Sequence, residues 1–162
     1  MEGAPFPDDM SFLWFLVLRV AGLMDRAGEA VFRRELSISL AQFLVLSVVD
    51  AHPGPLNQQA IADRLGLTKG TVSRQIENSV AAGLMTVQVS AHNRRENTVA
   101  LTAAGTDLVR RGDTIFQQAR EAALPAIVPD DMAATLRLLT TMNQSLDSYT
   151  RQNNTRSDLD TS

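Results

Sequence analysis

The sequence predicts a mainly α-helical protein: a winged helix-turn-helix with a small β-hairpin wing, flanked by helices on both sides. Two observations predict this class. Two short helical patterns are separated by the turn sequence Gly-Leu-Thr at 66–68. Two short strand-like runs, 85–89 and 98–101, follow them with a polar segment between. In such a module the second helix can enter a DNA groove while the hairpin reaches the neighbouring backbone.

The composition fits one domain of ordinary size over residues 1–162. Hydrophobic residues make up 44% of the chain and charged residues 20%, which is typical of a globular protein. The absence of cysteine excludes disulfides, thiolate catalysis and Cys-ligated zinc. The apolar run 12–18 is far shorter than the roughly 18 residues that span a bilayer, and it lacks the features of a secretory signal. We therefore expect a cytoplasmic protein with no membrane contact.

The charge is unevenly distributed along the chain. The net charge is −3, yet the stretch from Asn57 to Glu96 carries five positive and three negative residues. Lys69, the one lysine of the chain, lies in this stretch. The distribution of charge matters more than its total for a nucleic-acid partner. The distribution of charge therefore permits DNA binding.

Both ends of the chain are predicted to form dimerisation helices, over 8–36 and 124–150. The first is expected to begin near Asp8 or Asp9, yet its segment 12–18 is apolar on every face. A helix of this kind has to be covered on all sides, and in so short a chain the available cover is a second copy. The alternative is a core helix wrapped by its own chain. After the last helix, the polar residues 151–162 are predicted to be a disordered tail.

The region 39–123 is predicted to hold the winged helix-turn-helix and the long helix that follows it. Ser39-Leu40-Ala41-Gln42 has the sequence of a capping box, with Ile38 and Phe43 as its hydrophobic staple. Asn57 is expected to cap the helix 58–65, and Gly66 to end it. Four further positions complete the expectation: Thr68 caps the second helix, and its residues Val72, Ile76 and Val80 face the core. Thr102 is expected to cap the long helix to about Ala123.

The second helix of the motif carries small and polar residues that suit a major groove. Gly70 allows close approach to the DNA backbone, while Lys69 and Thr71 suit phosphate contact. Arg74 is the best candidate to read a guanine through two hydrogen bonds. The alternative for these residues is an ordinary solvated helix face. The predicted DNA-contacting residues are Gln58, Thr68, Lys69, Gly70, Thr71, Ser73, Arg74, Arg94 and Arg95.

Arg94 and Arg95 lie where the two strands would turn. Paired arginines at a hairpin tip suit a minor groove, because narrow A·T stretches concentrate negative potential there. The alternative is an ordinary charged turn. Their closeness in sequence to the helix-turn-helix favours DNA contact.

The stretch 56–84, LNQQAIADRLGLTKGTVSRQIENSVAAGL, and the stretch 93–105, NRRENTVALTAAG, resemble the MarR family of bacterial transcription regulators. The resemblance extends over about 11–146. The family's wing signature, Asp-x-Arg with a downstream Leu-Thr-x-x-Gly, falls on Asn93, Arg95, Leu101, Thr102 and Gly105. By this resemblance, Arg95 is the minor-groove arginine. Two departures weaken the expected hold on DNA: Asn93 replaces an acidic residue, and 85–87 lacks a basic residue that the family often has.

The resemblance implies a homodimer that binds a pseudo-palindromic operator in double-stranded DNA and usually represses nearby genes. It also implies release from DNA by a small, often aromatic ligand, bound between the dimerisation helices and the winged module. Candidates to line that cleft are Trp14, Arg19, Phe43 and His52. The alternative for Trp14 and Phe43 is plain packing, and His52 also suits a helix end.

Other functions find less support in the sequence. No nucleophile–base pair, phosphate loop or metal-spaced ligand set is recognisable, so we expect no enzyme, no cofactor and no metal. Two histidines without thiols do not suggest a zinc sensor. The negative net charge and thin basic patch leave open a protein-interaction module built on the same scaffold. A regulator without a small-molecule ligand also stays open.

Overall fold

The computed structural model describes residues 6–89, 97–123 and 128–159. The elements in chain order are α1 (Asp9–Leu36), α2 (Leu40–Asp50), β1 (Leu56–Asn57), α3 (Gln58–Leu65), α4 (Lys69–Ala81), β2 (Met85–Val89), β3 (Asn97–Leu101), α5 (Ala103–Ala123) and α6 (Pro129–Leu159). The predicted class, mainly α with a winged helix-turn-helix, is confirmed. The chain divides into two compact units, residues 1–119 and 120–162.

The helix-turn-helix forms where its end signals predict it. Asn57 begins α3, because its side chain accepts a hydrogen bond from the Ala60 amide at 2.8 Å. Gly66 ends the helix with φ +63°, a left-handed conformation that favours glycine. Thr68 begins α4, and its Oγ1 accepts from the Thr71 amide at 3.2 Å. Asn57 therefore fixes the start of α3, while Gly66 and Thr68 set the turn between the two helices.

The strands form one antiparallel sheet in the order β1-β3-β2. The predicted hairpin is present as β2 and β3, with Val87 opposite Val99. The additional strand is β1, where Leu56 and Asn57 pair with Val99 and Thr98. The sequence alone predicts no strand at Leu56, because its pairing with β3 depends on tertiary structure that a local pattern does not contain.

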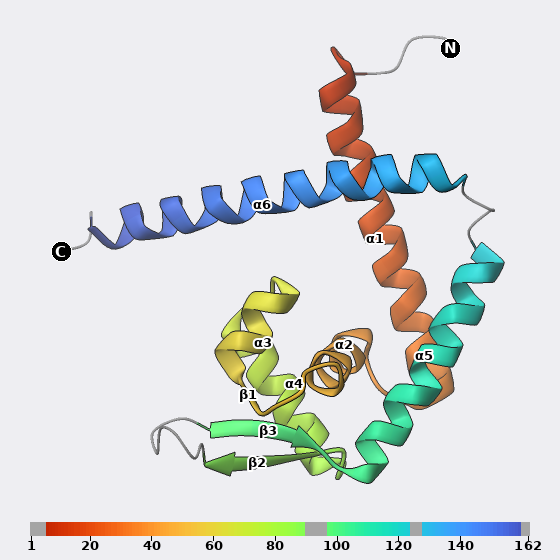
Figure 1. The fold of residues 1–162 in the computed structure, drawn as a ribbon, viewed down its shortest axis with the longest axis vertical. Helices are drawn as coiled ribbons and strands as arrows, with labels where there is room; N and C mark the ends of the chain where they lie inside the picture. Colours follow the sequence, from red (N-terminus) through yellow and green to blue (C-terminus); the bar gives the residue numbers. More distant parts are fainter. Residues whose placement is uncertain (1–5, 90–96, 124–127, 160–162) are drawn as a thin grey trace. The chain divides into compact units, whose positions relative to one another are not determined.

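The core of the first unit lies between α2, α3, α4 and the sheet (Figure 1). Its most deeply buried apolar side chains are Phe32, Val45, Leu46, Ile61, Val72, Ile76, Met85 and Val99. The expectation that Val80 faces this core is wrong, since Val80 is 40% exposed. The buried position belongs to Ser79, because a residue seven places after Val72 returns to nearly the same face of a helix, whereas the eighth is roughly 80° away.

Most of α1 extends beyond this core (Figure 1). Within this helix only Phe32 and Leu36, near its C-terminal end, are buried. Large apolar side chains are exposed along the rest of α1: Met10, Trp14, Phe15, Leu16, Leu18, Val20, Leu23 and Met24. Within the first unit, the core therefore covers only the C-terminal end of α1.

The second unit contains α6, which exposes the apolar side chains Met132, Leu136, Leu138, Leu139, Leu146 and Tyr149. The helix runs to Leu159, nine residues past the predicted boundary at 150. No proline or glycine follows Pro129, so nothing in the local sequence stops the helix at that boundary. Among the described residues, no helix is both long and apolar enough to cross a membrane.

Gly105 is needed for packing at the start of α5. A Cβ at this position would overlap the backbone carbonyl of Leu84, which cannot move aside as a flexible side chain could. We expect Gly105→Ala to lower the free energy of unfolding by about 1–3 kcal/mol, as overpacking usually does. Urea unfolding at matched protein concentration measures this change.

Gly54→Ala is the matched control, because a Cβ at Gly54 meets nothing within 4 Å. Its free energy of unfolding should stay within about 0.5 kcal/mol of the unsubstituted protein. Equal stability of the two variants would contradict the close packing of Gly105 on Leu84.

Candidate nucleic-acid interface

The start of α4 presents an open polar surface. Thr68, Lys69, Gly70 and Arg74 are exposed, and a Cβ at Gly70 would meet nothing within 4 Å. The Thr68 and Thr71 hydroxyls lie 2.9 Å apart and share a hydrogen bond. The positive end of the helix dipole lies at the same place. Unpaired amides, a lysine and a glycine without a side chain together suit close approach of an anionic backbone.

Glu77 adds a carboxylate that the sequence reasoning missed. The Ser73 hydroxyl donates to Glu77 Oε1 at 3.0 Å, one helical turn further along α4. Ser73 is therefore already engaged, and a carboxylate beside it can accept a hydrogen bond from a cytosine amino group. The signal was present in the sequence as a serine and a glutamate four residues apart, the spacing at which side chains on a helix meet.

The remaining predicted DNA-contacting residues are Gln58, Arg94 and Arg95. Gln58 is half-buried in the first turn of α3, which packs on α4. Arg94 and Arg95 lie outside the described residues, as does Asn93. The described part of the predicted set is thus concentrated in one and a half turns of α4, Lys69–Arg74.

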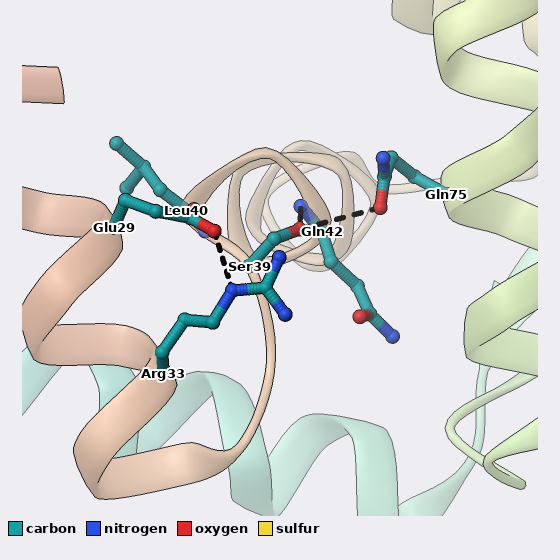
Figure 2. A network of polar contacts seen from close by, with 6 residues as sticks. All are labelled: Glu29, Arg33, Ser39, Leu40, Gln42 and Gln75. Carbon is teal, nitrogen blue, oxygen red and sulfur yellow. Dashed lines mark hydrogen bonds and ion pairs between the residues drawn. The ribbon is translucent and has the colours of Figure 1, made fainter. Parts of the chain in front are cut away.

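Buried polar contacts hold α4 against α2. Gln42 Nε2 donates to Ser79 Oγ at 3.2 Å, and Ser79 Oγ donates to the Gln75 carbonyl at 2.7 Å. The Ser39 hydroxyl also donates to Gln75 Oε1 at 3.4 Å (Figure 2). Both Gln42 and Ser79 are buried, so these hydrogen bonds satisfy groups that would otherwise be costly to bury.

The capping box predicted at the start of α2 forms only in part. Ser39 Oγ accepts from the Gln42 amide at 3.0 Å, as predicted. The Gln42 side chain does not close the box; it reaches across to Ser79 on α4. The reason is burial: Ser79 Oγ lies within reach in the core and offers Gln42 a partner that water cannot replace there.

Glu29 joins α1 to α2 at the same place. Its carboxylate accepts from the Leu40 amide at 2.8 Å and from Arg33 Nε at 2.6 Å (Figure 2). The hydrogen bond from the Leu40 amide is the main cause of a lowered pKa at Glu29, followed on the lowering side by Arg33. Glu29 is therefore ionised at neutral pH and satisfies one of the free amides of the first turn of α2.

Thr102 fixes the base of the wing. Its Oγ1 donates to the Gly83 carbonyl at 2.7 Å and accepts from the Gly105 amide at 3.1 Å. The Thr102 amide donates to the Leu84 carbonyl at 3.0 Å, the group on which Gly105 packs. The Leu-Thr-x-x-Gly pattern of the sequence is thus a junction between the end of α4, the sheet and α5.

The four candidate ligand-binding residues do not come together among the described residues. Phe43 is buried and stacks on Phe32, with ring centroids 4.2 Å apart. Trp14 lines a shallow apolar hollow of about 510 Å³ along the start of α1. His52 lines a different hollow of about 310 Å³ and hydrogen-bonds the Gly54 backbone through Nδ1. Arg19 is exposed on α1 and lines neither hollow.

The described residues also contain no group of three histidine, aspartate or glutamate side chains placed to hold a metal ion. The fold is that of a winged helix-turn-helix, a module in which the second helix of the motif can enter a DNA groove. The comparisons with known proteins make the class more specific.

Residues 36–96 match the model of the MarR family. Among solved structures, the Staphylococcus aureus MepR–DNA complex is 24% identical with a TM-score of 0.72, over 81% of this chain and 96% of that one. AbsC, a MarR family transcriptional regulator from Streptomyces coelicolor, is 18% identical with a TM-score of 0.77, over 90% and 99%. A MarR/EmrR family regulator from Acinetobacter sp. ADP1 is 17% identical with a TM-score of 0.78, over 87% and 99%.

The family model therefore matches the winged module, and the resemblance to the MarR family that the sequence indicated is confirmed. Members of this family are DNA-binding regulators and not enzymes. The structural similarity covers nearly the whole length of the solved proteins, so it includes the flanking helices as well as the winged module.

The Gln42–Ser79 pair allows a direct test of how α4 is held. We expect Gln42→Leu and Ser79→Ala each to lower the free energy of unfolding by about 1–3 kcal/mol, because each leaves a buried polar group with one partner fewer. The double variant removes both groups and should be less destabilised than the sum of the two. Chemical denaturation of the four proteins measures the coupling.

Additive losses would contradict a direct interaction between Gln42 and Ser79. Thr86→Ala, on an exposed strand position, is the control for a change of similar size and should be near neutral.

Proposed function

We propose that the protein is a homodimeric repressor that binds a pseudo-palindromic operator with α4 in the major groove. The observation that carries the proposal is the start of α4, where Lys69, Gly70 and Arg74 are exposed, Thr71 is half-buried, and the helix is held from behind by α2. An α-helix fits the major groove, and a guanidinium there can bind both acceptors of a guanine. In this proposal Gln58 and Thr68 flank the contact, and Arg94 and Arg95 reach the minor groove.

Two similar structures support DNA as the partner. The S. aureus MepR complex contains DNA. A mutant of MepR, 25% identical with a TM-score of 0.54 over 83% of this chain and 97% of that one, is bound to an oligodeoxyribonucleotide. The net charge of −3 does not oppose this, because the start of α4 carries positive charge locally. A cytoplasmic location stays part of the proposal, as the sequence predicts.

The exposed apolar side chains of α1 and of α6 support the homodimer. Scattered apolar residues are normal on a surface, but α1 exposes them over most of its length. A second copy of the chain would cover them in a symmetric pair. Two α4 helices related by a two-fold axis would then meet half-sites about one helical turn apart.

The last part of the proposal is release from DNA by a small ligand. The hollow beside Trp14 has an aromatic and apolar lining that suits an aromatic ligand, and Met10, Phe15 and Leu18 share it. Because this hollow lies on the face proposed to pair with a second copy, a ligand there would act through the dimer. Candidate aromatic acids added to a preformed DNA complex test this point.

The DNA contact is tested by Arg74→Ala on a site selected from random DNA by the purified protein. We expect a loss of about 1–3 kcal/mol, roughly 5- to 150-fold in affinity, with relaxed preference at one base position. Fluorescence anisotropy over a series of salt concentrations measures the affinity.

Arg110→Ala is the matched control, because Arg110 is also an exposed arginine on a helix but pairs with Asp107 on α5. It should bind like the unsubstituted protein. If neither variant changes affinity at any salt concentration, α4 does not read DNA; stable capture of a protein partner without DNA retention would then favour the interaction module.

The homodimer is tested by Leu18→Glu, which places a charge on the exposed apolar face of α1, where Leu18 is 61% exposed. We expect this variant to sediment as a monomer, since an unpaired buried charge opposes association. Val89→Glu is the control, at 63% exposure on β2, and should remain a dimer. Analytical ultracentrifugation measures both, and a monomeric unsubstituted protein would contradict the proposal.

A further inference from the structure

A polar hollow of about 400 Å³ lies between the C-terminal part of α1, the first turn of α2 and the middle of α4. The residues that decide its chemistry are Glu29, Arg33, Ser39, Arg74, Gln75 and Asn78. Figure 2 shows the Arg33 guanidinium extending from α1 in the direction of Ser39. Two arginines from different helices thus line one hollow, and one of them is the residue proposed to read DNA.

The hollow carries an excess of positive charge. Glu29 is the one carboxylate among its lining residues, against Arg33 and Arg74. Glu29 already accepts hydrogen bonds from the Leu40 amide and from Arg33 Nε. Arginine has five N–H donors, so the terminal nitrogens of Arg33 can still donate to another group. The hollow therefore has one carboxylate already engaged by two donors, and two guanidinium groups.

The position of the hollow relative to α4 indicates which anion it would meet. A helix with its side chains is about 10–12 Å across, and the major groove is about 12 Å wide. A helix that enters the groove therefore has a phosphate backbone directly along each side. Gln75 and Asn78 place the hollow on one side of α4, next to Arg74. One guanidinium group can bind two phosphate oxygens through two parallel hydrogen bonds, which makes arginine well suited to this position.

We propose that this hollow receives a backbone phosphate of the operator, with Arg33 of α1 as a phosphate-contacting residue that works beside Arg74. The inference rests on the proposed DNA binding by α4. It gives α1 a second role: the helix that exposes an apolar face also contributes to the DNA-binding surface. Arg33 is not among the residues that the sequence indicates, because it belongs to a different helix, more than twenty positions before α3.

The experiment compares Arg33→Ala with Arg34→Ala and Arg33→Lys on the selected operator. Arg34 is the matched control: its side chain is 70% exposed against 64% for Arg33, it pairs with Glu35, and it does not line the hollow. Affinity is measured from about 50 to 200 mM salt. Each phosphate contact contributes about 0.9 to the slope of log K against log salt concentration.

We expect Arg33→Ala to reduce this slope by about 0.9 per bound subunit and to weaken binding by a similar factor on all DNA sequences. Arg34→Ala should leave the slope unchanged, and Arg33→Lys should keep it, because the lysine retains the charge. Thermal unfolding of each variant serves as the control for folding; exposed ion pairs of this kind contribute little stability.

Three results would overturn the inference while the proposed DNA binding stands. Arg33→Ala and Arg34→Ala could have the same slope. Arg33→Lys could reduce the salt slope and the affinity as much as Arg33→Ala does, which would indicate a structural role for Arg33. Arg33→Ala could weaken binding of inorganic phosphate, measured by calorimetry without DNA, and leave the DNA slope unchanged; the hollow would then hold a free anion. Failure of the unsubstituted protein to bind any DNA would instead overturn the proposed function.

Discussion

The structure of the interface depends on how Ser79 is buried. A serine in the core needs partners, and Ser79 finds them in the side chain of Gln42 and the carbonyl of Gln75. These bonds fix the rotation of α4 about its own axis, since a rotation by one residue would replace Ser79 by Val80 and leave Gln42 without its acceptor. The same rotation decides that Arg74 faces outward. The buried hydrogen bond on one side of α4 thereby determines which side chains the opposite side exposes.

Local sequence signals predicted the described helices well, because each helix start or end depends on a few neighbouring residues. The caps at Asn57 and Thr68 and the end at Gly66 are all in place, and they determine the helix-turn-helix. What the sequence did not predict involves partners far apart in the chain. Pairing of β1 with β3, and the Gln42 side chain leaving its capping box for Ser79, depend on contacts that exist only after the helices have packed. The burial of Ser79 in place of Val80 also runs against the simple preference for apolar residues in a core.

The candidate site was predictable to a similar extent. The residues at the start of α4 follow one another in sequence, so a correct helix start was enough to place them. Glu77 and Arg33 were missed for different reasons. Glu77 is acidic, and a search for DNA contacts through positive charge passes over it. Arg33 lies on another helix and meets Arg74 at one hollow only in the folded chain. The ligand candidates stay a prediction; within one chain, Phe43, Trp14 and His52 occupy different surroundings.

The small number of positive residues constrains how such a protein would bind DNA. With a net charge of −3, long-range attraction to DNA is weak, and little affinity is available from charge alone. Few phosphate contacts also mean a shallow dependence on salt and weak binding to random sequences. Discrimination between the operator and random DNA would then have to come from well-positioned contacts, which requires α4 to be rigid. The polar contacts that tie α1 to α2 and α2 to α4 hold α4 in one orientation, which is what well-positioned contacts with DNA would require.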